Sequence, residues 1–417
     1  MEVYSRILEE RLREVFRHFP VLVLTGARQV GKSTLVEKIF GSEMETIVFD
    51  PAEDIGNARQ DPDFFLQNHP PPLFLDEIQY APELLSAIKR RVDREKKKGM
   101  YILSGSQNFS VLKSISESLA GRVFVQELFP MSLRERNKNL SETSFLKSWL
   151  ESKGSLDLKE IRNLFKNSTP PSDTLIANVW KGGYPALLHL PDNLLGGYWR
   201  SYFQTYIERD IRSMSNIGNL HTFGKFFALL SALTAQEVNA TELGRELGID
   251  RKTAIHWKEI AIASYQWLEI PSFGRNPIKK LSGKSKGYFT DPGFITYFQG
   301  IPTPQILETH PFLGRMVETY MVMEILKIIS DLDYRPNLYH FRNRSGSEVD
   351  LILEYGGVYF PFEIKTKSHI NGNDCRGITT FRKLFPNESI APGIVLSAIE
   401  SPEKITETSI AIPYWIL

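Results

Sequence analysis

An apolar strand, a glycine-containing loop and a helix follow one another at residues 20–40, and this order restricts the fold more than any other feature of the sequence. The stretch reads PVLVLTGARQVGKSTLVEKIF, and its loop matches the pattern G-x-x-x-x-G-K-[ST]. Backbone N–H groups of such a loop surround phosphate oxygens, and the dipole of the following helix adds positive potential. We therefore expect a phosphate-binding loop in which Lys32 reaches the β- and γ-phosphates and Ser33 holds Mg²⁺. The residues of this loop are Gly26, Ala27, Arg28, Gln29, Val30, Gly31, Lys32, Ser33 and Thr34.

Further apolar runs alternate with helical stretches up to about residue 135. These runs are ETIVFD, PPLFLDEI and GMYILSGSQN, and the alternation predicts a parallel sheet with helices on its faces. Asp76 and Glu77 end the second run, where ligands bind in open α/β sheets. We expect Asp76 to support Mg²⁺ and Glu77 to orient or deprotonate the water that attacks the γ-phosphate. The alternative is that this acid pair only caps the next helix.

Two other positions are candidates for the same nucleotide site. Ser106 follows the third apolar run, and it could hydrogen-bond the γ-phosphate or belong to an ordinary turn. Arg122 follows a helix-ending glycine in ESLAGRV, and a guanidinium can neutralise charge in the transition state as an arginine finger or sensor. The alternative for Arg122 is an ion-paired residue on the surface.

Length and composition limit the number of domains and the classes of partner that we expect. A chain of 417 residues can hold two or three domains, and its net charge of +1 gives no global basic excess for nucleic acid. The single cysteine fits a reducing compartment, and no apolar run reaches the roughly 20 residues of a membrane helix, so we expect a cytoplasmic protein without membrane association. The pattern predicts an α/β core at residues 1–135, a helical lid-like region at 136–230, and further regions at 231–300 and 301–417.

Residues 239–260 predict a helix–turn–helix. The stretch NATELGRELGIDRKTAIHWKEI contains two helical parts separated by GID, and Gly248 suits the turn. Arg251, Lys252, Thr253 and His256 then occupy the first turns of the second helix, from which a recognition helix contacts DNA. The following stretch, PSFGRNPIKKLSGKSKG, predicts a basic wing whose candidate phosphate contacts are Lys279, Lys280, Lys284 and Lys286. Alternatively, this module docks on the α/β core or on a neighbouring copy of the chain.

Residues 348–365, EVDLILEYGGVYFPFEIK, predict a β-hairpin with a Gly-Gly turn. The register of a two-residue loop places Asp350 opposite Glu363 in a non-hydrogen-bonded pair, where like charges approach closely and repel. A cation should therefore lie between them. It is either a divalent metal or a basic side chain such as Lys365, Arg342 or Arg344.

The order of the motifs resembles the bacterial and archaeal AAA+-type ATPases that carry a C-terminal domain of unknown function. The motifs are TGARQVGKST, PPLFLDEIQ, YILSGSQNF, SLAGRV, ELFPMSLRE, GGYPALL and YIERDI. The resemblance implies ATP as the nucleotide, a winged-helix-like segment and a small C-terminal α/β domain of restriction-endonuclease-like fold. Glu318, Asp350, Glu363 and Lys365 resemble the PD-(D/E)XK nuclease core, in which carboxylates hold Mg²⁺ and the lysine activates water.

Together these features lead to two functional hypotheses. The first is an ATP-binding, slowly ATP-hydrolysing protein that associates with nucleic acid and has a nuclease-like, metal-binding C-terminal domain. The second is an ATP-gated regulatory switch whose C-terminal domain binds a partner without cleaving it.

Overall fold

The computed structural model describes residues 3–50, 56–105, 119–140, 144–206, 217, 219–274 and 284–417. Ser106, Lys279 and Lys280 lie outside these residues, as does most of the YIERDI motif. Residue contacts divide the chain into two units, and the first comprises Met1–Met131, Tyr184–Ala186 and Ile260–Gln266. The second comprises Ser132–Gly183, Leu187–Glu259 and Trp267–Leu417. Every helix among the described residues is too short or too polar to cross a membrane.

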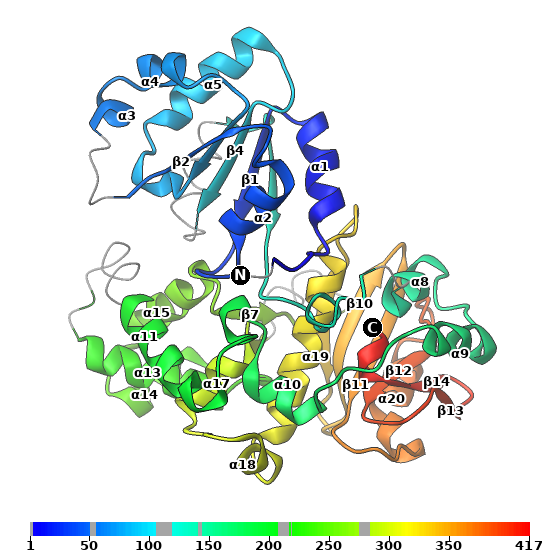
Figure 1. The fold of residues 1–417 in the computed structure, drawn as a ribbon. Helices are drawn as coiled ribbons and strands as arrows, with labels where there is room; N and C mark the ends of the chain where they lie inside the picture. Colours follow the sequence, from blue (N-terminus) through cyan, green and yellow to red (C-terminus); the bar gives the residue numbers. More distant parts are fainter. Residues whose placement is uncertain are drawn as a thin grey trace. The chain divides into compact units, whose positions relative to one another are not determined.

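A parallel sheet forms the centre of the first unit (Figure 1). Among the described residues its strands run in the order β2 (Glu45–Val48), β3 (Leu73–Asp76), β4 (Tyr101–Gly105), β1 (Val21–Thr25) and β5 (Val123–Glu127). Every pairing is parallel. The central strands β1, β3 and β4 are buried along their whole length, as expected for apolar runs covered on both faces. The predicted α/β fold of this region is confirmed.

Helices of the first unit cover this sheet and complete its core. Helix α5 (Leu84–Glu95) buries Leu84, Ile88 and Val92, whose spacing of four residues places them on one face of the helix. These side chains belong to one apolar cluster with residues of β1, β3 and β4. Among the described residues, the other helices of this unit are α1 (Glu9–His18), α2 (Lys32–Phe40), α3 (Gly56–Gln60) and α4 (Pro62–Asn68).

The second unit begins with a largely helical region. Helix α14 (Ala240–Leu247) ends at Gly248, whose φ of +67° is the left-handed conformation that ends many helices, and α15 (Arg251–Ala263) follows. The two predicted helices and their turn are confirmed. Strands β6 (Gln236–Glu237), β8 (Lys286–Phe289) and β7 (Trp267–Ile270) form a small sheet in that order. The other helices that the structure describes in this region are α7 (Leu133–Arg136), α8 (Phe145–Glu151), α9 (Leu158–Lys166), α10 (Leu175–Lys181), α11 (Leu195–Tyr206), α13 (Leu220–Ala232), α17 (Pro292–Phe298) and α18 (Pro304–Glu308).

A buried aspartate explains the glycines of the GGYP motif. The carboxylate of Asp291 accepts hydrogen bonds from the backbone N–H groups of Gly183, at 2.7 Å, and Gly293, at 2.9 Å. A Cβ atom on Gly182 would lie 2.0 Å from Asp291 Oδ1, and the φ of Gly182 is +81°. Position 182 therefore accepts only glycine without a local rearrangement.

A mixed sheet forms the C-terminal part of the second unit (Figure 1). Helix α19 (Leu313–Ile329) precedes it, and α20 (Arg376–Leu384) packs against β10 and β11. In the described residues the strand order is β13 (Glu403–Thr406), β14 (Ser409–Pro413), β12 (Gly393–Ser397), β11 (Val358–Ile364), β10 (Glu348–Tyr355) and β9 (Asn337–Arg342). The domain boundaries predicted at residues 230 and 300 stay predictions.

The predicted hairpin of β10 and β11 is confirmed in its register. Gly356 and Gly357 have φ values of +57° and +79°, as in a type I′ turn. The pairs run from Tyr355 opposite Val358 to Leu351 opposite Phe362. The same register, continued by one residue, places Asp350 opposite Glu363.

Candidate functional site

The loop between β1 and α2 contains three residues with positive φ angles, which let the backbone turn tightly. Gly26, Gln29 and Gly31 have φ values of +141°, +60° and +94°. A Cβ atom on Gly26 would lie 2.2 Å from the carbonyl oxygen of Leu128, so only glycine fits there. Ala27 and Val30 are buried, Arg28 is half-buried, and Gln29 and Thr34 are exposed.

Lys32 closes the loop on itself. Its side chain is buried, and the ammonium donates hydrogen bonds to the carbonyl oxygens of Gly26 and Ala27, both at 2.9 Å. These charge-assisted bonds hold the ammonium within the curve of the loop. This is the place from which the predicted contact with phosphate oxygens would be made.

Ser33 and Asp76 meet at the carboxyl end of the sheet. The Ser33 hydroxyl, in the first turn of α2, donates to Asp76 Oδ2 at 2.5 Å, although β4 lies between β1, which precedes the loop, and β3, which ends in Asp76. Asp76 Oδ1 accepts from the Ser104 hydroxyl at the end of β4 and from the backbone N–H of Glu77, at 3.0 Å. The hydroxyl and carboxylate predicted to serve Mg²⁺ are thus brought together, and these oxygen ligands fit that ion. Sequence reasoning missed Ser104, whose signal was a polar residue inside an apolar run.

Glu77 directly follows this carboxylate. Its φ is +56°, a left-handed conformation that is uncommon for glutamate, and its side chain accepts a hydrogen bond from Gln79 Nε2. It makes no side-chain capping bond to the following short helix, η1 (Ile78–Tyr80). The alternative interpretation of Glu77 as a helix cap therefore gains no support. This left-handed backbone conformation sets the direction in which the Glu77 side chain extends from the end of β3.

Arg6, which sequence reasoning missed, holds the back of the loop. It is 7% exposed, and its guanidinium donates to the carbonyl oxygens of Val30, at 2.9 Å, and Phe129, at 2.7 Å. These contacts join the phosphate loop to the segment that follows β5. No local pattern in the sequence marks Arg6, because both contacts are long-range.

Arg122 lies at the other end of the sheet from this loop. It directly precedes β5, which runs parallel to β1, whereas the loop follows β1. Its guanidinium is paired with both carboxylate oxygens of Asp93 on α5, at 2.5 and 3.0 Å. The hydrogen bond from Arg122 lowers the pKa of Asp93 below its ordinary value. The structure therefore does not bring Arg122 to its own nucleotide site, and a finger role on another copy of the chain stays a prediction.

The predicted nucleic-acid residues occupy the start of α15. Arg251, Lys252 and His256 are exposed, whereas Thr253 donates its hydroxyl to Asp250 Oδ2 at 2.6 Å. Lys284 of the predicted wing is exposed too. Lys286 is not, because it lies in β8 with 4% of its side chain exposed. The prediction that Lys286 contacts DNA phosphates is therefore wrong.

Lys286 instead lies among the carboxylates predicted to bind metal. Its ammonium is 2.6 Å from Glu318 Oε1 on α19, 2.6 Å from Glu348 Oε1 and 3.7 Å from Asp350 Oδ1, both on β10. Burial opposes the charge of Lys286, but the surrounding carboxylates, Glu318 first, keep its pKa above the ordinary value. We call Lys286, Glu318, Glu348, Asp350, Glu363 and Lys365 the carboxylate cluster.

The remaining members of the cluster also have partners. Glu363 Oε2 is 3.0 Å from the ammonium of Lys365, and Asp350 Oδ2 accepts from the backbone N–H of Ile364 at 2.8 Å. Glu318 Oε1 accepts from the Tyr288 hydroxyl at 2.8 Å. Burial raises the pKa of Glu363, and the neighbouring Asp350 carboxylate adds to this shift. With Lys286 in place, no three His, Cys, Asp or Glu side chains of the described residues are arranged to hold a metal ion.

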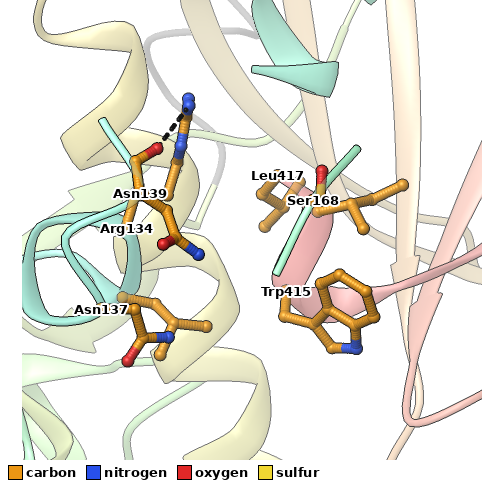
Figure 2. Close-up of a pocket in the computed structure, with 8 residues that line it drawn as sticks. Arg134, Asn137, Asn139, Ser168, Trp415 and Leu417 are labelled. Atoms are coloured by element: carbon orange, nitrogen blue, oxygen red, sulfur yellow. Dashed lines mark hydrogen bonds between the residues drawn. The ribbon is translucent and has the colours of Figure 1, made fainter. Parts of the chain in front are cut away.

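Figure 2 shows a separate pocket in the second unit, where the last residues of the chain face the segment after α7. Arg134 donates to the carbonyl oxygen of Asn139 at 3.2 Å on one side of it. None of the predicted site residues lines this pocket, so it belongs to neither candidate site. Its lining consists of Leu133, Arg134, Asn137, Asn139, Ser168, Trp415, Ile416 and Leu417.

Comparison with protein families assigns the first unit to a class. Residues 18–137 match the family model described as an AAA domain, and together with the sheet and the loop this match defines a P-loop domain of the AAA type. Two models described as domains of unknown function match later parts of the chain, DUF8612 at residues 172–305 and DUF4143 at residues 313–417. The AAA-type prediction is confirmed, and the nuclease-like fold of the C-terminal domain stays a prediction.

Particular relatives come from two mycobacteria. The uncharacterized protein Rv2008c of Mycobacterium tuberculosis is 26% identical over 374 residues, which cover 88% of this chain and 75% of the relative. The uncharacterized protein Mb2031c of Mycobacterium bovis gives the same values. Neither name states a function.

Two solved structures show weaker likenesses. The Walker-type ATPase PABY2304 of Pyrococcus abyssi has a TM-score of 0.45 at 16% identity, covering 71% of this chain and 96% of that protein. The RuvB Holliday junction branch migration motor of Thermotoga maritima has a TM-score of 0.31 at 14% identity, covering 67% of this chain and 96% of RuvB. Both scores are too low to assign a function.

Proposed function

We propose that the chain binds ATP at the loop of residues 26–34 and hydrolyses it slowly. The observation that carries this proposal is the hydrogen bond between Ser33 and Asp76, at 2.5 Å. It joins the two motifs that a nucleotide site needs, although they lie 43 residues apart in the sequence and follow strands β1 and β3, which are not neighbours in the sheet. A glycine-containing turn without a ligand would not require this convergence.

The roles of the residues follow from their positions. Backbone N–H groups of the loop and the amino end of α2 would face the phosphates, and Lys32 would exchange its bonds to Gly26 and Ala27 for bonds to the β- and γ-phosphates. Ser33 and Asp76 would hold Mg²⁺, which neutralises charge on the phosphate oxygens when it is bound. Glu77 would orient the attacking water and accept its proton.

Calorimetry with the full chain tests this proposal. We expect Lys32→Ala to abolish ATP binding, whereas Glu77→Gln keeps the affinity and loses turnover. Lys97→Ala is the matched control, because Lys97 is a lysine of the same unit whose side chain is 72% exposed. Equal ATP affinity in Lys32→Ala and the wild type would contradict the assignment.

We further propose that the exposed start of α15 binds nucleic acid through Arg251 and Lys252, with His256 on the same helix. Contacts with phosphates weaken as salt rises, because binding releases counterions. The double variant Arg251→Ala/Lys252→Ala should weaken binding in gel shifts and lower the salt slope by about 1 for each lost contact. Arg245→Ala, on the preceding helix α14 and 76% exposed, is the control. Absence of binding by the wild type at low salt, with and without nucleotide, would leave a protein partner.

We propose that the C-terminal domain binds a partner without cleaving it. The metal that the nuclease resemblance implies does not fit the residues present, because the Lys286 ammonium lies between Glu318, Glu348 and Asp350. We therefore derive no cleavage step at this cluster. In this proposal ATP controls a switch, and the C-terminal domain serves as a docking module. A nuclease assay with Mg²⁺ or Mn²⁺ that shows cleavage lost in Asp350→Asn would contradict it.

A further inference from the structure

The carboxylate cluster has a cation at its centre that comes from outside the predicted hairpin. Lys286 belongs to β8 of the small sheet, whereas Glu318 lies on α19 and Glu348 and Asp350 lie on β10. All of these residues belong to the second unit. The ammonium of this β8 residue thus contacts α19 at 2.6 Å and β10 at 2.6 and 3.7 Å.

Each of the four carboxylates already has a protein partner at one of its oxygens. Glu318 Oε1 is shared by Lys286 and the Tyr288 hydroxyl, and Glu348 Oε1 is bonded to Lys286. On the hairpin, Asp350 Oδ2 accepts from the N–H of Ile364, and Glu363 Oε2 accepts from Lys365. A divalent ion held by Glu318, Glu348 and Asp350 would have to lie where the ammonium lies, so the two cations exclude one another.

Helix α20 closes the cluster on another side. A Cβ atom on Gly377 would lie 1.7 Å from the carbonyl oxygen of Glu348 and 2.2 Å from Glu363 Oε1. The helix backbone is therefore in direct contact with both strands, and the second oxygen of Glu363 faces protein. The negative charge of Glu363 is balanced by Lys365, whose side chain is 30% exposed.

We infer that Lys286 is the resident cation of the carboxylate cluster, taking the position of a divalent metal ion, and that this site becomes able to bind such an ion only when Lys286 is absent. The repulsion between Asp350 and its neighbours is relieved by this ammonium together with Lys365. The ion pairs of the cluster then hold β8 against α19 and the C-terminal sheet. This inference concerns a site that the proposed ATP chemistry does not use.

Manganese binding to the nucleotide-free full chain tests the inference, and the electron paramagnetic resonance signal of free Mn²⁺ gives the amount bound. We expect wild type and Asp350→Asn to bind the same amount of Mn²⁺. Lys286→Met should bind one more ion per chain than the wild type, and adding Asp350→Asn to it should remove that ion. Lys286→Arg, which keeps the cation, should behave as the wild type does. Lys284→Met is the matched control, because Lys284 is an exposed lysine two positions away.

Two outcomes would overturn the inference. One is a wild-type chain that binds one more Mn²⁺ than Asp350→Asn, because the site would then accept metal beside Lys286. The other is a folded Lys286→Met variant that gains no Mn²⁺. If Lys286→Met does not fold, the comparison of wild type with Asp350→Asn still decides. ATP affinity, measured in the same samples, should be equal in all variants, so failure here is distinct from failure of the proposed nucleotide site.

Discussion

The guanidinium of Arg6 donates a hydrogen bond to the carbonyl oxygen of Val30 at 2.9 Å. The C=O of Val30 and the N–H of Gly31 belong to one planar, trans peptide unit and point in opposite directions. Because Arg6 fixes the carbonyl, it also fixes the Gly31 N–H, which points away from Arg6. Arg6 thus positions a donor of the phosphate loop without touching the nucleotide, and it lies outside the residues 18–137 that match the AAA domain.

Arg6→Met should weaken ATP binding by roughly tenfold, the size expected when a hydrogen bond to a charged group is lost. The effect should be large for ATP and ADP and small for adenosine, because only the phosphates meet the loop. Calorimetric affinities of the three ligands measure this difference. Arg6→Lys should restore part of the affinity, and Arg17→Met, an exposed position on α1, should change none. An equal loss for adenosine and ATP would show that Arg6 supports the fold and not the loop.

Removal of Mg²⁺ should distinguish Ser33 from its neighbours. In the wild type we expect EDTA to weaken ATP binding, because Ser33 and Asp76 no longer hold the ion that faces the phosphates. In Ser33→Ala the ATP affinity should already be low with Mg²⁺ present, and EDTA should lower it little further. Titrations with and without EDTA measure both. A full EDTA effect in Ser33→Ala would remove Ser33 from the metal site.

Gly26 should be among the least replaceable residues of the first unit. Its φ is +141°, and an added Cβ atom would meet the Leu128 carbonyl oxygen at 2.2 Å. Gly26→Ala should lower the free energy of unfolding by about 2 kcal/mol or more, because the backbone must shift. Gly197→Ala is the contrasting variant. It lies in α11 with open space around it, so alanine should raise stability by about 0.5–1 kcal/mol. Chemical denaturation measures both changes.

Arg122 offers a test of action between copies of the chain. Because it precedes β5 and pairs with Asp93, Arg122→Ala should leave the ATP affinity of the chain unchanged. If Arg122 serves the site of another copy, turnover per chain should rise with protein concentration in the wild type but not in Arg122→Ala. Asp93→Asn, which frees the guanidinium, should then act in the opposite direction. Turnover that is independent of concentration in all three proteins would mark Arg122 as an ordinary surface ion pair.

Local features of the sequence predicted the parts of the fold that local chemistry decides. The Gly356-Gly357 turn sets the hairpin register, and the strand–loop–helix order sets the loop around Lys32. Both depend on residues that are close in sequence. The turn at Gly248 and the helices on either side of it were predictable for the same reason.

Long-range contacts were not predictable in this way. Arg6 reaches Phe129 across 123 residues, and Lys286 reaches Glu348 across 62. Nothing near Lys286 in the sequence separates a buried lysine of β8 from the basic loop residues before it. The position of Arg122 was predictable in principle. A residue that precedes one strand of a parallel pair lies at the opposite end of the strands from a loop that follows the other strand. Its position could have been inferred once β5 was recognised as parallel to β1.

The cation of the carboxylate cluster is joined to the chain by peptide bonds. The occupancy of a free metal ion follows its concentration, whereas Lys286 is held beside Glu318 at a fixed effective concentration. Domains that are held together by a dissociable ion lose stability when chelators or competing ligands withdraw it. The contact between β8 and the C-terminal sheet has no such dependence. In the proposed function ATP takes Mg²⁺ into its own complex, and this would withdraw nothing from the contact between Lys286 and Glu318, because the ammonium cannot leave the chain.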